Sequence, residues 1–142
     1  MDRAQLQRLV EDRVVDAQAL LSAGRWSAAY YLIGYAVECG LKSCILAHLA
    51  GNVAIIFEEG NKRYSEKCWS HNVDELVGLA GLERQRKTDT NANSTLGNNW
   101  MIAKDWKETS RYKQTSEVDA KKLWSAVTDN PDGVLRWIKS HW

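Results

Sequence analysis

Four side chains able to form polar contacts recur along one long apolar stretch, residues 25–50, which contains no proline. Their spacing of i, i+4, i+7 and i+11 places them on one face of a helix. They are Tyr31, Tyr35, Glu38 and Lys42. A carboxylate is costly to bury without a partner, so Glu38 needs a cation nearby. Two arrangements supply one: an ion pair with Lys42 one turn later, or a contact with Arg111 or Arg136 from a later helix.

Histidines and cysteines are the other candidates for acid–base or redox chemistry. His71 precedes an expected helix start and His48 lies near the end of the apolar stretch, so we expect capping, loop or core roles for both. Three cysteines are an odd number, and Cys39 and Cys44 fall inside the apolar stretch, which predicts reduced thiols packed in a core. No Cys/His spacing fits a zinc site, so we predict neither a metal nor a cofactor.

Charge and composition narrow the class of protein. The 142 residues carry a formal net charge of +1, which gives no electrostatic case for a dedicated nucleic-acid binder, although a local patch can still bind RNA. We interpret the basic cluster at residues 84–87 as a solvated face rather than a phosphate site. The N-terminus lacks the apolar segment of a signal peptide, and Glu38 and Lys42 argue against a membrane span. We therefore expect one cytoplasmic domain, residues 1–142.

These side chains must be positioned by helices, because one proline, nine glycines and few β-branched runs disfavour a sheet. The expected helices cover residues 3–23, residues 25–50, a short segment after an N-cap at Asn72, one or two turns within residues 100–106, a segment beginning at Ser116, and residues 131–142. Gly24 ends the first helix and leads into an antiparallel hairpin with the second.

Three segments join these helices. Residues 51–67 are expected to form a connector with an apolar patch at 53–57, and the asparagine-rich residues 88–99 are expected to form a loop. Residues 129–133 fit either a turn or the start of the last helix. We favour a helix that begins at Pro131, with Asp129 or Asn130 as its N-cap, because residues 131–142 then present an apolar stripe.

An amphipathic helix, a Gly-Arg turn and the run YLIGYAVECGLKSCI follow one another in an order that resembles the HEPN domain family. The matching positions are Tyr31, Leu32, Gly34, Tyr35, Ala36, Glu38, Leu41 and Lys42. The resemblance continues at HNVDELVGLAGL, at Ser110, Arg111 and Tyr112, and at GVLRWIKSHW, and so covers most of the chain. It implies an all-α, up-down bundle of four to five helices that forms a two-fold homodimer.

Many HEPN proteins are metal-independent endoribonucleases of toxin or defence type, marked by Arg-x4-His late in the chain, and Arg136 and His141 match that motif. The resemblance implies that His141 is the general base or acid and Arg136 the phosphate anchor, which suits a near-neutral imidazole and a permanent cation. On a helix these two side chains diverge by about 140°, so a dimer would be needed to join two copies of the site. The supporting polar network would comprise Glu38, Lys42, Tyr31, Tyr35, Arg111 and Tyr112.

The resemblance also allows a function of another class. Some HEPN domains are non-catalytic modules that dimerise and dock a partner, here a nucleotidyltransferase antitoxin encoded beside the chain. Arg136 would then be a surface residue, and His141, the penultimate residue, a C-terminal cap favoured by the helix dipole. The sequence leaves the two functions open.

Overall fold

A computed structural model describes residues 1–51 and 64–142, and within these ranges the chain is all-α, with eight α-helices, one 3-10 helix and no strand. The elements are α1 (Arg3–Ser22), α2 (Trp26–Gly51), α3 (Tyr64–Lys67), α4 (Val73–Leu79), α5 (Glu83–Ala92), α6 (Ser94–Lys104), the 3-10 helix η2 (Glu108–Tyr112), α7 (Glu117–Thr128) and α8 (Val134–Lys139). The predicted all-α class is confirmed. The apolar patch expected at 53–57 lies outside the described residues.

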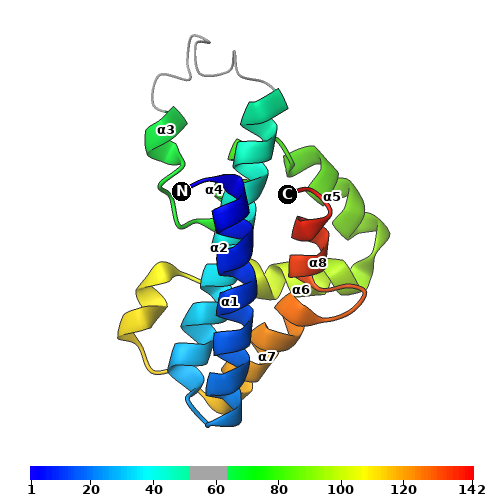
Figure 1. Ribbon diagram of the computed structural model, residues 1–142. Helices are drawn as coiled ribbons and strands as arrows, with labels where there is room; N and C mark the ends of the chain where they lie inside the picture. Colours follow the sequence, from blue (N-terminus) through cyan, green and yellow to red (C-terminus); the bar gives the residue numbers. More distant parts are fainter. Residues whose placement is uncertain (52–63) are drawn as a thin grey trace.

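Helices α1 and α2 form the antiparallel hairpin that Gly24 predicted (Figure 1). Asp2 caps α1 by accepting from the Gln5 backbone N–H at 2.8 Å, while the Gln5 side chain accepts from the Asp2 backbone N–H at 2.8 Å. Gly24 adopts a left-handed conformation with φ 71°, which glycine tolerates better than other residues. The hairpin thereby fixes the start of α2 at Trp26.

Helix α2 is the centre of the fold, and α1, α4, η2, α7 and α8 all pack against it (Figure 1). Its fully buried side chains include Ile33, Leu41 and Ile45. By length and composition α2 could also cross a membrane, but 61% of its most apolar window is buried inside this fold. The buried surface of α2 therefore explains its apolar composition, and the cytoplasmic location stays a prediction.

Two other expected helix starts, after Asn72 and at Ser116, are confirmed at their N-caps. The Asn72 side chain accepts from the Glu75 backbone N–H at 3.0 Å, and Ser116 accepts from the Asp119 backbone N–H at 3.1 Å. Each bond satisfies one backbone donor that the first helical turn would otherwise leave open.

The prediction of a loop at 88–99 was wrong, because α5 and α6 cover most of these residues. Asn93 separates the two helices and caps α6 by accepting from the Leu96 backbone N–H at 3.1 Å. Leu96, Trp100 and Ala103 form the buried face of α6, whereas α5 contributes no buried residue. The polar segment is therefore helical, because Asn93 caps α6 and an apolar stripe on α6 packs into the core.

The last helix also differs from its prediction. Helix α8 begins at Val134 with Gly133 as its N-cap and ends at Lys139, so Pro131 lies in a turn before the helix. The Gly133 backbone N–H donates to the Asp129 carbonyl at 2.9 Å, and the Asn130–Pro131 peptide is cis. A β-carbon at Gly133 would lie 2.4 Å from that carbonyl oxygen, so the turn requires glycine. Residues 129–133 therefore form a turn, and the favoured prediction that the last helix begins at Pro131 was wrong.

Candidate functional site at Glu38

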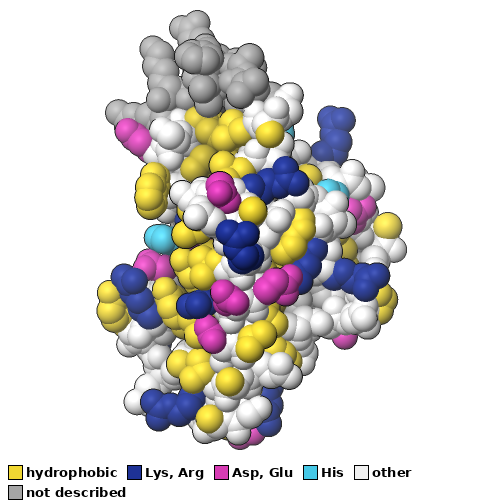
Figure 2. All heavy atoms as spheres, in the orientation of Figure 1, with side chains coloured by type: hydrophobic (Ala, Val, Ile, Leu, Met, Phe, Trp, Pro, Cys, Tyr) yellow, Lys and Arg dark blue, Asp and Glu magenta, His cyan; other side chains and the backbone are white. Residues whose placement is uncertain are grey.

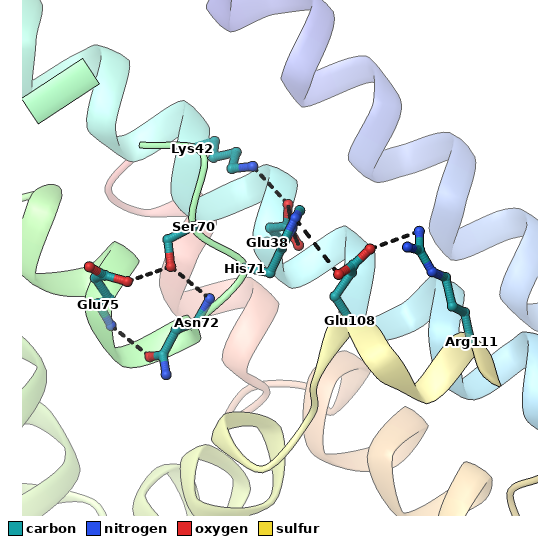
Figure 3. Close-up of polar contacts among 8 residues, drawn as sticks. All are labelled: Glu38, Lys42, Ser70, His71, Asn72, Glu75, Glu108 and Arg111. Atoms are coloured by element: carbon teal, nitrogen blue, oxygen red, sulfur yellow. Dashed lines mark hydrogen bonds and ion pairs between the residues drawn. The ribbon is translucent and has the colours of Figure 1, made fainter. Parts of the chain in front are cut away.

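Glu38 lies on α2 with only 1% of its surface exposed, and two donors reach its carboxylate (Figure 3). Lys42 Nζ donates to Oε1 at 2.8 Å from one turn later on the same helix. His71 Nδ1 lies 3.0 Å from each carboxylate oxygen. The pair with Lys42 is one of the two arrangements expected from the sequence, and His71 is a partner that the sequence did not indicate.

The segment between α3 and α4 holds His71 in place. The Ser70 hydroxyl donates to Glu75 at 2.5 Å and accepts from the Asn72 backbone N–H at 3.1 Å, while Asn72 caps α4 (Figure 3). His71 is therefore a loop residue, as predicted, between two residues fixed by hydrogen bonds. Its side chain remains 47% exposed, so one edge of the imidazole faces Glu38 and the rest is open to solvent.

Glu108, on η2, extends the network from His71 to Arg111 (Figure 3). Its Oε1 pairs with Arg111 Nη1 at 2.7 Å, and its Oε2 lies 3.9 Å from His71 Nε2. The guanidinium of Arg111 also lies 4.7 Å from the centre of the Tyr112 ring. Arg111 therefore joins the network through Glu108, not through Glu38.

The tyrosines of α2 line up beside this network. The rings of Tyr31 and Tyr35 are stacked with centroids 6.2 Å apart, and Tyr31 also contacts Trp106 at 6.1 Å. Burial, together with a hydrogen bond to Cys39, raises the pKa of Tyr35 to about 12. Tyr35 thus stays a neutral phenol, and the structure brings Tyr31, Tyr35, Glu38, Lys42, Arg111 and Tyr112 into one region.

This arrangement suits acid–base chemistry. A carboxylate that accepts from Nδ1–H keeps the imidazole in the tautomer whose free lone pair is on Nε2. In His71 that nitrogen lies 3.9 Å from Oε2 of Glu108, and the side chain as a whole is about half exposed. Among the described residues, no group of three His, Cys, Asp or Glu side chains could hold a metal ion.

A hollow of about 560 Å³ lies next to the network, under the start of α2. Tyr31 and Arg111 line it from the network side, and residues 24–28 together with Gln114 and Thr115 line the rest. The Thr115 backbone N–H donates to the Ser27 hydroxyl at 2.8 Å, which closes one wall. The hollow therefore combines two arginines with two aromatic rings.

Arg136 and His141 lie away from this network, at the C-terminal end of the chain. Arg136 is exposed and donates from Nη1 to Asn130 Oδ1 at 2.6 Å. His141 lies beyond the end of α8, and its ring packs on Trp137 with centroids 4.5 Å apart. Trp137 in turn donates from Nε1 to Asp89 at 2.8 Å. The two residues thus have different partners, and their catalytic role stays a prediction.

Sequence reasoning missed His71 and Glu108 as members of the network. His71 is 33 positions from Glu38, and no helical spacing connects residues that far apart. The available signal was chemical: a buried carboxylate needs more than one donor, and His71 precedes a capped helix that packs on α2.

Comparisons with protein-family models, with curated proteins and with solved structures found no match to this chain. The HEPN resemblance therefore depends on the residues quoted for it, and membership of that family stays a proposal.

Proposed function

We propose that this chain is a HEPN-like protein that acts on RNA, a metal-independent endoribonuclease of toxin or defence type with Arg136 and His141 as its reactive pair. The observation that supports the proposal is the packing of the His141 ring on Trp137, with centroids 4.5 Å apart, while Arg136, the residue before Trp137, is exposed. Residues past a helix end tend to fray. Trp137, which is 8% exposed, gives the imidazole a packing partner beyond the end of α8.

The chemistry needs a proton acceptor and a positive charge. His141 takes the proton of the ribose 2′-hydroxyl, which increases the rate by roughly 10² to 10⁴, and Arg136 binds the phosphate on which charge develops. A two-fold homodimer places two copies of the pair together. Lys139, between them in sequence, pairs with Glu11 on α1 at 2.5 Å and so anchors α8.

The test incubates purified protein with single-stranded RNA in EDTA, beside His141→Ala and Arg136→Ala. Arg84→Ala removes an equally exposed arginine from α5 and serves as the matched control. We expect cleavage by the wild type and the control and a loss of at least 100-fold in the two site variants. The nuclease proposal is lost if the wild type cuts no better than His141→Ala. A monomer in light scattering at micromolar concentration removes the paired-site mechanism.

A second candidate function, the non-catalytic docking module, is favoured by a different surface. A groove of about 480 Å³ beside Glu38 is lined mainly by apolar residues of α2, where hydrophobic side chains gather between α2 and α3 (Figure 2), and Trp69 in its lining is 79% exposed. Large exposed apolar side chains beside a groove are typical of protein-interaction surfaces. This candidate docks a nucleotidyltransferase encoded beside the chain.

Titration of that nucleotidyltransferase against this protein tests the second candidate. Trp69→Ala should weaken binding by at least tenfold, because exposed tryptophans often dominate interfaces. Met101→Ala, which shortens another exposed apolar side chain on α6, is the control and should leave the affinity unchanged. Equal affinities for the wild type and Trp69→Ala would exclude the groove as the docking surface.

A further inference from the structure

We propose that His71 and Arg111 form a second site on this chain, which takes a phosphodiester of single-stranded RNA. His71 is its acid–base residue and Arg111 its anion-binding residue. The substrate class rests on the RNA function proposed above, but the residues are different. Arg136 and His141 have their contacts with Asn130 and Trp137, whereas His71 and Arg111 belong to the Glu38 network.

Glu38 orients the imidazole of His71. Glu38 is 1% exposed, and both of its oxygens lie 3.0 Å from His71 Nδ1, so the carboxylate fixes the ring and its tautomer. Lys42 Nζ, at 2.8 Å from Oε1, pairs with the same carboxylate. A buried carboxylate that holds a half-exposed histidine directs Nε2 outward as a base, which is the role of the carboxylate in hydrolase triads.

Glu108 lies between His71 and Arg111. Its carboxylate pairs with Arg111 at 2.7 Å and lies 3.9 Å from His71 Nε2, so an anion already occupies the space between the imidazole and the guanidinium. A phosphodiester also has two unesterified oxygens that share one negative charge, so it can take the place of this carboxylate between the two groups. We infer that the phosphodiester displaces Glu108, which is the first residue of a short 3-10 helix.

The charges around this position are balanced. Glu38 and Glu108 are opposed by Lys42 and Arg111, and the raised pKa of Tyr35 leaves its phenol neutral. When Glu108 swings out, the position gains a net positive charge. The site is therefore selective for anions only after Glu108 has left, and removal of its charge should strengthen binding.

The hollow under the start of α2 leaves room for the rest of the substrate. The hollow of about 560 Å³ shares Tyr31 and Arg111 with the network and contains Arg25 and Trp26. Aromatic rings beside cations are how proteins hold single-stranded nucleic acid, since a base stacks on the ring and a phosphate meets the cation. A nucleotide next to the scissile phosphate fits there.

The reaction at this site is an internal transesterification of the RNA backbone. His71 Nε2 takes the proton from the 2′-hydroxyl, the 2′-oxygen forms a bond to phosphorus, and the bond from phosphorus to the 5′-oxygen breaks. The leaving 5′-oxygen takes a proton from water, and His71 returns its proton to solvent. The products are a 2′,3′-cyclic phosphate and a 5′-hydroxyl, and Arg111 neutralises the charge on phosphorus in between.

Binding is tested without turnover by NMR of the histidine ring nitrogens, with deoxyuridylyl-adenosine as the probe, which lacks the 2′-hydroxyl at the scissile position. We expect an Nδ1–H tautomer for His71 and ring shifts that saturate with the dinucleotide. Arg111→Ala should weaken binding at least tenfold, and Glu108→Gln should tighten it several-fold. His71 signals that do not move, or a Glu108→Gln variant that binds no tighter, overturn the proposal.

Cleavage is tested in the His141→Ala background, so that the two sites report separately. We expect His141→Ala to keep a slower cleavage of RNA in EDTA, and the added His71→Gln substitution to remove it by at least 100-fold. Cleavage that His141→Ala alone abolishes supports the Arg136–His141 function and overturns the catalytic role of His71. A wild type that cuts no RNA overturns the nuclease function and the catalytic role together, and the dinucleotide titration then decides the binding site by itself.

Discussion

Both carboxylate oxygens of Glu38 lie 3.0 Å from Nδ1 of His71, although the two residues are 33 positions apart in the sequence. Glu38 belongs to the central helix α2, and His71 to the segment that enters α4. This contact therefore joins two segments that are distant in the sequence, whereas the Glu38–Lys42 pair lies within α2.

Removal of the Glu38 carboxylate should destabilise the fold. Glu38→Ala leaves Lys42 and His71 without their acceptor and opens a small cavity, and we expect the free energy of unfolding to fall by about 1–3 kcal/mol. The control is Glu117→Ala, which breaks a Glu–Lys pair of the same i, i+4 spacing with Lys121, where both side chains are exposed. That variant should change stability by no more than about 0.5 kcal/mol. Urea denaturation measures both, and equal losses would mean that His71 adds nothing to the buried pair.

A close contact between Gly34 and Trp106 gives the second prediction. A β-carbon at Gly34 would lie 2.2 Å from the indole ring of Trp106, which is 2% exposed and cannot move into solvent. Gly34→Ala should therefore lower the free energy of unfolding by about 1–3 kcal/mol through overpacking. Because Tyr31 contacts the same indole, near-ultraviolet circular dichroism should change as well.

Gly78→Ala is the matched control for that substitution. Gly78 is in α4, and a β-carbon there would meet nothing within 4 Å. Alanine is a better helix former than glycine, so this variant should gain up to about 1 kcal/mol in thermal or urea unfolding. A gain in both variants, or a loss in both, would contradict the assigned packing.

Much of the fold could be predicted because it depends on local signals. Residues 25–50 could be identified as the core helix from length and composition, and Asn72 and Ser116 could be identified as N-caps from residue type. Asn93 is also a capping residue, but its polar neighbours in α5 have no apolar stripe to mark a helix. Without that periodicity the sequence could not show two helices at residues 83–104.

The turn before α8 and the Glu38 network could not be predicted for different reasons. At residues 129–133 the local signals of a turn and of a helix start coincide, and the crowding at Gly133 decides between them only in three dimensions. The contact of Glu38 with His71 depends on how α4 packs on α2, which no local pattern encodes. The Glu38–Lys42 pair follows from helical spacing alone, and it was one of the two arrangements that the sequence predicted for Glu38.

The three thiols should react at different rates, which gives the third prediction. Burial raises the pKa of Cys39 to about 11 and that of Cys44 to about 12, so neither forms the reactive thiolate near pH 8. Burial also raises the pKa of Cys68, but Cys68 is only partly buried, whereas Cys39 and Cys44 are buried. Iodoacetamide at pH 8 should therefore modify one site per native chain, read by mass spectrometry.

The matched variants identify that site. Cys68→Ser should abolish labelling of the native protein, and Cys44→Ser should leave it unchanged. All three cysteines should react in guanidinium chloride. Labelling of Cys39 or Cys44 in the native state, at a rate comparable to Cys68, would contradict their burial.

The same two buried thiols make the fold sensitive to alkaline pH. Below the ordinary pKa of 9.0 a thiol is protonated in both the folded and the unfolded chain, so the full stability is present. Between pH 9 and about 11 to 12 the unfolded chain loses these protons and the folded chain keeps them. The unfolded state then binds fewer protons, so stability falls as pH rises, by up to about 1.4 kcal/mol per pH unit for each thiol.

The test compares the wild type with the double variant Cys39→Ala/Cys44→Ala by urea denaturation at about pH 8.5 to 10.5. Cys39 also contributes to the raised pKa of Tyr35, so the difference in slope contains the two thiols and a smaller change at that phenol. The double variant starts from a lower stability but should lose less of it with pH, and parallel slopes would show that Cys39 and Cys44 ionise as easily in the folded chain as in the unfolded one.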